Sequence, residues 1–154
     1  MFKYALAATL ALAASTATAE MWTLDGDNSV VGFGSVKSDS IGEGHSFTCL
    51  SGTVSEEGMV ELTLDLSTVQ TNIDIRNERI LEHVFKMAPS AQLLAEVDMG
   101  AMDGLAVGGT MTTLVEGTLM FLGQEIYVDL PVIAARLSDE QVLIVSDGVT
   151  YIST

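Results

Sequence analysis

Apolar and polar side chains alternate strictly along the stretch Val60-Glu61-Leu62-Thr63-Leu64-Asp65-Leu66, which follows Met59. This period of two places four apolar side chains on one face of a strand and three polar ones on the other. A strand with one wet face is typical of an antiparallel sheet. The preceding Ser-Glu-Glu-Gly at 55–58 predicts a hairpin loop, so the chain around residue 60 is expected to form antiparallel β-structure.

The same reasoning extends outward to further strands. Residues 29–36 place Val31, Phe33 and Ser35 on one face. Pro131 has no N–H to give to a sheet, so its part of a strand is expected at an edge, a bulge or a bend. The remaining predicted strands are 93–99, 111–121, 125–137 and 142–145, with turns at 122–124 and 138–140.

One segment, at about residues 72–86, has a helical period instead. Thr71 and Asp74 resemble a capping box at its start. Glu82 and Lys86 are spaced as an i,i+4 ion pair. Many short strands with one inserted helix predict a mainly β fold, an antiparallel barrel or sandwich. The apolar stripe of this helix consists of Ile73, Ile80, Leu81, Val84 and Phe85.

Residues 1–19 have the form of a secretory signal peptide. Lys3 supplies the positive start, an apolar run follows, and Ala17-Thr18-Ala19 has the small-x-small form of a cleavage site. We therefore expect a single mature domain over residues 20–154, exported to the periplasm in a bacterium with two membranes. No later stretch is apolar enough for a transmembrane segment, so stable membrane insertion is not expected.

The charge balance of the whole chain argues against several partners. The sequence has 21 acidic and 6 basic residues, a formal net charge of -15. A nucleic-acid binder needs clustered Lys and Arg, and electrostatic docking on anionic lipid needs the same, so neither is expected. The single cysteine, Cys49, excludes an intrachain disulfide and any metal centre with several cysteines.

Motifs for catalysis are lacking. The sequence has no nucleophile elbow, phosphate-binding loop, dinucleotide fingerprint or His-Glu-x-x-His helix. His45 and Cys49 stand four apart on a probable strand and could form a nucleophile pair, but a small buried thiol beside a rim histidine is the simpler interpretation. His83 has no second ligand near it in the sequence. We expect no enzyme activity, no catalytic residues and no cofactor.

Methionines crowd the middle of the chain and allow two interpretations. Thioethers suit Cu(I), but copper sites cluster them tightly, and only Met99 and Met102 are three apart. Methionine also fills cores and lines adaptable apolar cavities. We expect core or cavity lining, and no metal site, for Met87, Met99, Met102, Met111 and Met120.

Half of the basic residues lie within the predicted helix. Between positions 76 and 86, Arg76, Arg79 and Lys86 stand against only Glu78 and Glu82, so this window is locally positive on a strongly negative chain. Such a window could hold an anionic head group, ideally through an arginine fork. It could also be a solvated helix with ordinary surface ion pairs.

From Trp22 onward the sequence resembles the YceI-like family of exported bacterial proteins. The resemblance rests on Trp22-Thr23-Leu24-Asp25, Ser29-Val30-Val31-Gly32-Phe33, Gly52-Thr53-Val54, residues 64–72 and 117–132, and above all Arg76-Asn77-Glu78-Arg79-Ile80-Leu81 with Phe85. Asn77, Arg79 and Ile80 stand where the family has Asp, His and Leu. Family members usually continue past a segment like residues 149–153, so the chain ending at Thr154 is expected to be C-terminally short or to close its barrel differently.

The resemblance implies a lipocalin-like antiparallel β-barrel around an elongated apolar cavity. It also implies a long polyisoprenoid-type lipid in that cavity, held for transport or storage. Which lipid, and its donor and acceptor, do not follow from the sequence. A homodimer is possible. The alternative is a periplasmic interaction or structural module whose barrel core is filled and holds no ligand. The residues expected to contact the ligand are Phe33, Phe47, Arg76, Arg79, Ile80, Val84, Phe85, Met120, Phe121 and Tyr127.

Overall fold

The computed structural model describes residues 20–37 and 41–152, and the predicted signal peptide lies outside them. The chain is mainly β, as expected. Its helices are α1 (Asp74–His83) and α2 (Met99–Asp103), with two short 3-10 turns at Gly26–Asn28 and Leu66–Thr68. The strands are β1 (Glu20–Thr23), β2 (Val31–Lys37), β3 (Ile41–Phe47), β4 (Leu50–Ser55), β5 (Met59–Asp65), β6 (Val69–Gln70), β7 (Ser90–Glu96), β8 (Thr110–Phe121), β9 (Gln124–Arg136) and β10 (Val142–Ser146).

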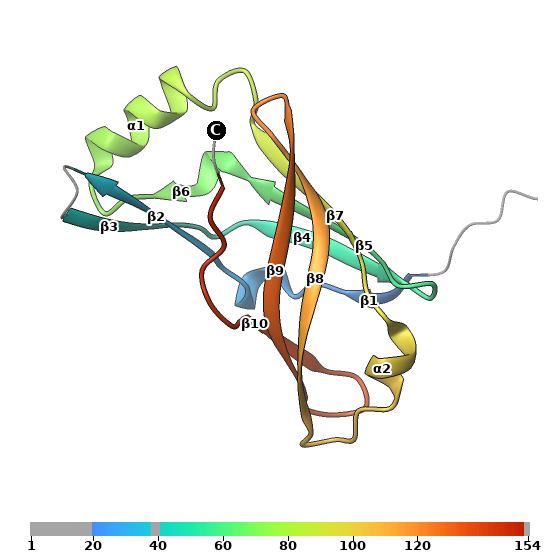
Figure 1. The fold of residues 1–154 in the computed structure, drawn as a ribbon. Coiled ribbons are helices and arrows are strands. Elements are labelled where there is room, and N and C mark those ends of the chain that lie inside the picture. The colour runs from blue at the N-terminus through green and yellow to red at the C-terminus, as the bar shows by residue number, and fades with distance from the viewer. Residues whose placement is uncertain (1–19, 38–40, 153–154) are drawn as a thin grey trace, which may run out of the picture.

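The strands form two antiparallel sheets. Seven of them follow the order β1-β4-β5-β7-β8-β9-β10, and three follow the order β2-β3-β6. The larger sheet curls into a half-barrel (Figure 1), and the smaller sheet extends from it toward α1, while α2 lies at the opposite end. This is the lipocalin-like architecture predicted from the sequence, with β1 and β10 as the two edges of the larger sheet.

Alternation along the strands separates an inner from an outer face. In β8, Leu119 and Phe121 pack against the core, so Thr118 and Met120 face the other way. In β5, Leu64 is buried and Glu61 is exposed, as the alternation predicted. The largest buried cluster lies at the α1 end and consists of Phe47, Leu50, Leu64, Leu66, Val69, Phe85 and Ala91.

Most predicted strands are confirmed to within a few residues, but the region after β7 is not. The strand expected at 93–99 ends at Glu96, and residues 99–103 form α2. The Asp98 side chain accepts a hydrogen bond from the Ala101 N–H and caps this helix. Five residues are too few to show a helical period, which is why the pattern did not predict α2.

Helix α1 is shorter than the predicted 72–86. It ends at His83, and Val84 and Phe85 both donate backbone hydrogen bonds to the Ile80 carbonyl as the chain turns inward. Lys86 is therefore outside the helix, and the expected Glu82–Lys86 pair is wrong. Glu82 instead lies 3.8 Å from His83 Nε2.

The expected capping box is also wrong. Ile73 is the N-cap residue and makes no side-chain cap. The Thr71 hydroxyl, instead of capping the helix, donates to Asn77 Oδ1 at 2.7 Å, and the Thr71 N–H donates to the same oxygen at 2.9 Å. Asn77 thus links the first turns of α1 by hydrogen bonds to Thr71, the residue that follows β6.

The structure decides two further expectations, one about Cys49 and one about Pro131. Cys49 follows the end of β3 and is exposed, so it is neither a buried thiol nor on a common strand with His45. Pro131 lies within β9, beyond the last β10 pair at Val132 and Ser146. The Pro131 carbonyl oxygen accepts a hydrogen bond from the Asp147 N–H. The N–H and C=O of one strand residue point to the same side, so the N–H that Pro131 lacks would point away from β8, and the pairing with β8 loses no hydrogen bond.

Candidate functional site

A row of aromatic rings crosses the interior at the α1 end of the molecule. Its ring centroids are separated by 5.1 Å from His45 to Phe33, 4.8 Å from Phe33 to Phe47, 5.9 Å from Phe47 to Phe85 and 6.2 Å from Phe85 to Phe121. We call these five residues the aromatic row. It joins the small sheet, the end of α1 and strand β8.

Strand register explains how the row forms. Phe33 pairs with His45, and Val31 pairs with Phe47, so their side chains share one face of the β2–β3 hairpin. Phe85 and Phe47 are both 7% exposed or less, whereas Phe33 is 37% exposed. The row therefore runs from a solvent-accessible ring in the small sheet into the buried cluster.

Polar groups stand at the exposed end of the row. Arg76 Nη2 donates to Glu43 Oε1 at 3.0 Å, and both side chains are 31% exposed. Glu43 is two residues from His45 on β3 and therefore shares its face. His45 Nδ1 is buried and has no hydrogen-bond partner within the described structure. A guanidinium with unused donors and an unpaired ring nitrogen can both orient a polar group placed against the rings.

Two open depressions lie at opposite ends of the molecule. The first, of about 430 Å³, lies where the end of α1 meets the β8–β9 turn, and is lined by His83, Val84, Met87, Ala88, Leu122 and Gly123. The second, of about 720 Å³, has an acidic lining formed by Glu57, Glu96, Val97, Asp98, Met99, Gly100, Leu114 and Glu116. Among the described residues, no group of three or more His, Cys, Asp or Glu side chains could hold a metal ion.

The structure brings most of the predicted contact residues to one end. Phe33, Phe47, Phe85 and Phe121 belong to the aromatic row, and Ile80 packs against the buried cluster beside them. Val84 lines the first depression.

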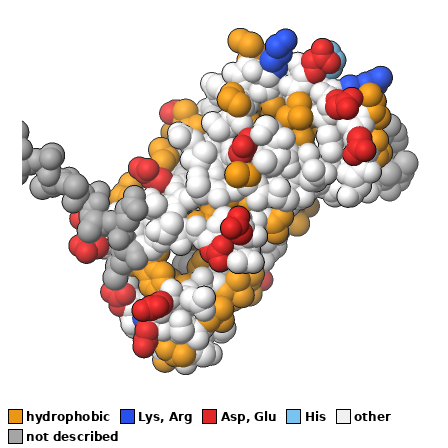
Figure 2. Space-filling view, turned by 180° about the vertical axis from the view of Figure 1, so that it is seen from behind, with side chains coloured by type: hydrophobic (Ala, Val, Ile, Leu, Met, Phe, Trp, Pro, Cys, Tyr) orange, Lys and Arg blue, Asp and Glu red, His pale blue; other side chains and the backbone are white. Residues whose placement is uncertain are grey.

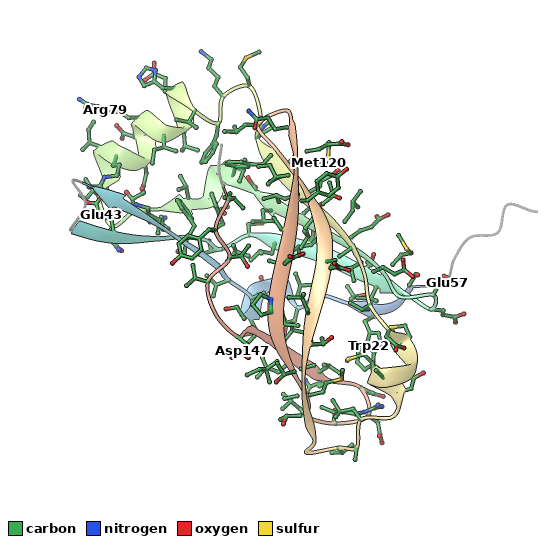
Figure 3. All side chains as sticks on the ribbon, in the orientation of Figure 1. Trp22, Glu43, Glu57, Arg79, Met120 and Asp147 are labelled. Carbon is green, nitrogen blue, oxygen red and sulfur yellow. The ribbon has the colours of Figure 1, made fainter. Side chains whose placement is uncertain are left out.

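The two arginines of α1 have different surroundings. Arg76 pairs with Glu43, whereas Arg79 is exposed and extends from α1 away from the sheets (Figure 3).

Met120 and Tyr127 lie apart from this group. Met120 is between Leu119 and Phe121, both of which pack inward, so its side chain is on the outer face. Tyr127 pairs with Thr118 on that same outer face and is 85% exposed. Conversely, Glu43 and His45 were not among the predicted contact residues. Only the β2–β3 register places them beside Phe33, because a slip of one residue would turn both outward.

The fold and the row together define a lipocalin-like β-protein with an aromatic inner site. The chain is similar to a solved structure described as a polyisoprenoid binding domain from Saccharophagus degradans implicated in plant cell wall breakdown. The two have 33% sequence identity and a TM-score of 0.70, and the match covers 77% of this chain and 69% of that chain. The chain therefore belongs to the same family of YceI-like domains. No family model matches it, and no curated protein is similar to it.

Proposed function

We propose that this protein binds a long-chain isoprenoid or similar apolar lipid along the aromatic row. The observation that carries the proposal is the continuous series of rings from Phe33 to Phe121, with the outermost ring accessible to solvent. The relative from Saccharophagus degradans, described as a polyisoprenoid binding domain, supports the same class of ligand.

Apolar contact would supply most of the affinity. Each CH₂ group buried against the rings contributes about 0.8 kcal/mol, so a chain of several isoprene units binds firmly without any charged contact. Binding sites of this kind use a few polar groups to fix the orientation of the ligand. We assign that role to His45 Nδ1 and Arg76, which lie at the outer end of the row.

The proposed role is to carry or store the lipid without reacting with it. We place this role in the periplasm, because residues 1–19 have the form of a signal peptide. None of the described helices is long and apolar enough to cross a membrane. A paired general acid and general base must lie close enough to reach one substrate. His45 lies in the β2–β3 hairpin, whereas His83 is at the end of α1 near Glu82.

A second candidate function is an interaction module with a filled interior and no ligand. The observation that favours it is that Phe47, Phe85 and Phe121 already pack on one another, with 5.9 and 6.2 Å between ring centroids. Under this alternative the rings are simply core, and Phe33 is the outermost member of it.

Lipid extraction decides between the two. The protein is purified without detergent, extracted with organic solvent and examined by mass spectrometry, and the stripped protein is then offered a fluorescent prenyl lipid. We expect a co-purified prenyl lipid and saturable uptake in one-to-one proportion. An empty protein that takes up no prenyl lipid would contradict lipid binding and leave the interaction module.

A further inference from the structure

We propose that the end of the molecule where α1 meets the β8–β9 turn docks on the surface of a phospholipid bilayer. This docking end consists of Arg79, His83, Val84, Lys86, Met87 and Leu122. The inference rests on the proposed lipid-binding function, because a carrier of a membrane-soluble lipid must collect its ligand from a bilayer. It differs from membrane insertion, since only side chains of the surface would enter the lipid.

Large apolar side chains project from this end into solvent. Met87 is 92% exposed, Val84 is 45% exposed and Leu122 is 36% exposed. They come from segments more than thirty residues apart, yet line one depression of about 430 Å³. Exposed apolar groups gathered on one surface of a protein mark a site of contact with another apolar surface.

The charge of the chain is distributed unevenly around this end. Residues 74–88 carry Arg76, Arg79 and Lys86 against three acidic residues and are electrically neutral, so the whole formal charge of -15 belongs to the rest of the chain. Arg79 and Lys86 form no ion pair with any other described residue. In Figure 2 the prominent Lys and Arg side chains lie at this end, together with acidic, histidine and hydrophobic side chains.

These features favour a bilayer over other occupants. Apolar side chains flanked by Lys and Arg are the pattern of interfacial binding, in which the aliphatic stems lie along the lipid and the charged groups reach the phosphates. The acidic depression at the other end, which includes Glu57, Glu96 and Asp98, is repelled by anionic lipid. The molecule therefore approaches a bacterial membrane with α1 first.

Docking at this end would bring the proposed ligand site to the membrane. Val84 and Leu122 line the depression, and the next residue inward on each segment, Phe85 and Phe121, belongs to the aromatic row. A prenyl chain leaving the bilayer beside Met87 would thus meet the rings without crossing the acidic part of the surface.

A position-specific probe tests the docking. In the full chain with Cys49→Ser, an environment-sensitive fluorophore is attached after Met87→Cys, or, as the matched control, after Met59→Cys. Met59 is a 49% exposed methionine at the start of β5. Vesicles of phosphatidylethanolamine and phosphatidylglycerol, free of prenyl lipid, are then added. We expect the probe at position 87 to brighten and shift to the blue while the probe at position 59 stays unchanged.

Matched substitutions test the forces. The probe is moved to the exposed first residue of β9, after Gln124→Cys, so that position 87 can be varied. Met87→Asp should then lower the affinity for these vesicles by about tenfold or more. Met59→Asp adds the same charge elsewhere and should leave it unchanged. Reversal of both Arg79 and Lys86 to Glu should lower it by at least about 25-fold, since each basic residue near an anionic surface contributes about fivefold.

Three results would overturn the docking proposal. They are an unresponsive probe at position 87, an equal response at position 59, and Met87→Asp binding as tightly as the unsubstituted chain. An unresponsive probe at position 87 would favour a protein partner, and not a bilayer, as the occupant of this end. Uptake of prenyl lipid from detergent micelles is measured separately. Uptake without a vesicle response rejects only the docking, and a vesicle response without uptake rejects only the proposed lipid binding.

Discussion

Phe85 and Phe121 pack edge to face, with 6.2 Å between ring centroids and 64° between ring planes. One ring follows the end of α1 and the other ends strand β8. The contact therefore holds the helix against the half-barrel, and it depends on α1 stopping at His83, since Phe85 turns inward only because the helix has ended.

Removal of the Phe85 ring should destabilise the protein strongly. Phe85 is 7% exposed, and Phe→Ala changes in cores cost about 3–5 kcal/mol in the free energy of unfolding. Urea denaturation of Phe85→Ala measures this loss. The neighbouring Val84→Ala is the control, since Val84 is 45% exposed and its truncation should cost much less. Equal losses for the two variants would contradict the packing described.

Substitutions on the inner and outer faces of the sheets should differ in their effect on lipid affinity. Phe33→Ala removes an inner ring that stacks on Phe47 with 4.8 Å between ring centroids. Prenyl-lipid binding should weaken by about tenfold or more, which is the contribution expected from burying one apolar side chain. Tyr127→Ala removes an outer ring and should leave binding unchanged. Titration with a fluorescent prenyl lipid checks both, and a larger loss for Tyr127→Ala would place the ligand outside the half-barrel.

Charge reversal on α1 should lower the affinity only for ligands that carry a charged head group. Arg76→Glu is expected to weaken binding of a prenyl pyrophosphate while a neutral prenol of equal length binds as before, because the guanidinium pairs with phosphate and not with the apolar chain. Competition binding with the two ligands gives the comparison. Unchanged affinity for the pyrophosphate would reject the head-group role.

Asn77 offers a test of how α1 is fastened. Asn77→Ala leaves the buried Thr71 without the oxygen that accepts from its N–H and hydroxyl, and should cost about 1–3 kcal/mol of stability. Asn77→Asp keeps that oxygen and should be close to neutral. Thermal unfolding of the two variants is the measurement. A stable Asn77→Ala variant would show that water replaces the lost acceptor.

Period-two alternation was sufficient to predict most strands and hence the mainly β fold. The run from Val60 to Leu66 specifies one buried and one wet face by itself, and the structure has β5 there with Leu64 buried. The exact end of α1 was not predictable, because Val84 and Phe85 continue the apolar stripe of the helix. Phe85 leaves the helix to pack in the buried cluster, a tertiary contact that a local pattern does not contain.

The candidate site depended on register, which the sequence does not specify. Phe33, Phe47, Phe85 and Phe121 are brought together in the row, but nothing in the local sequence distinguishes Phe121 from its neighbour Met120. The β8–β9 pairing turns the first inward and the second outward. His45 joined the row through its pairing with Phe33, a relation between two strands that no single segment reveals.

The open edge of strand β10 has a consequence that we expect at high protein concentration. Within the part of the chain that the structure describes, β10 pairs only with β9, and Leu143, Ile144 and Val145 are each more than 40% exposed. An unpaired apolar edge can receive a strand from another copy. The formal charge of -15 keeps copies apart at low salt, and this repulsion weakens once the Debye length falls from about 10 Å at 0.1 M toward about 3 Å at 1 M. We therefore expect any association of copies through this edge to increase with ionic strength and with protein concentration.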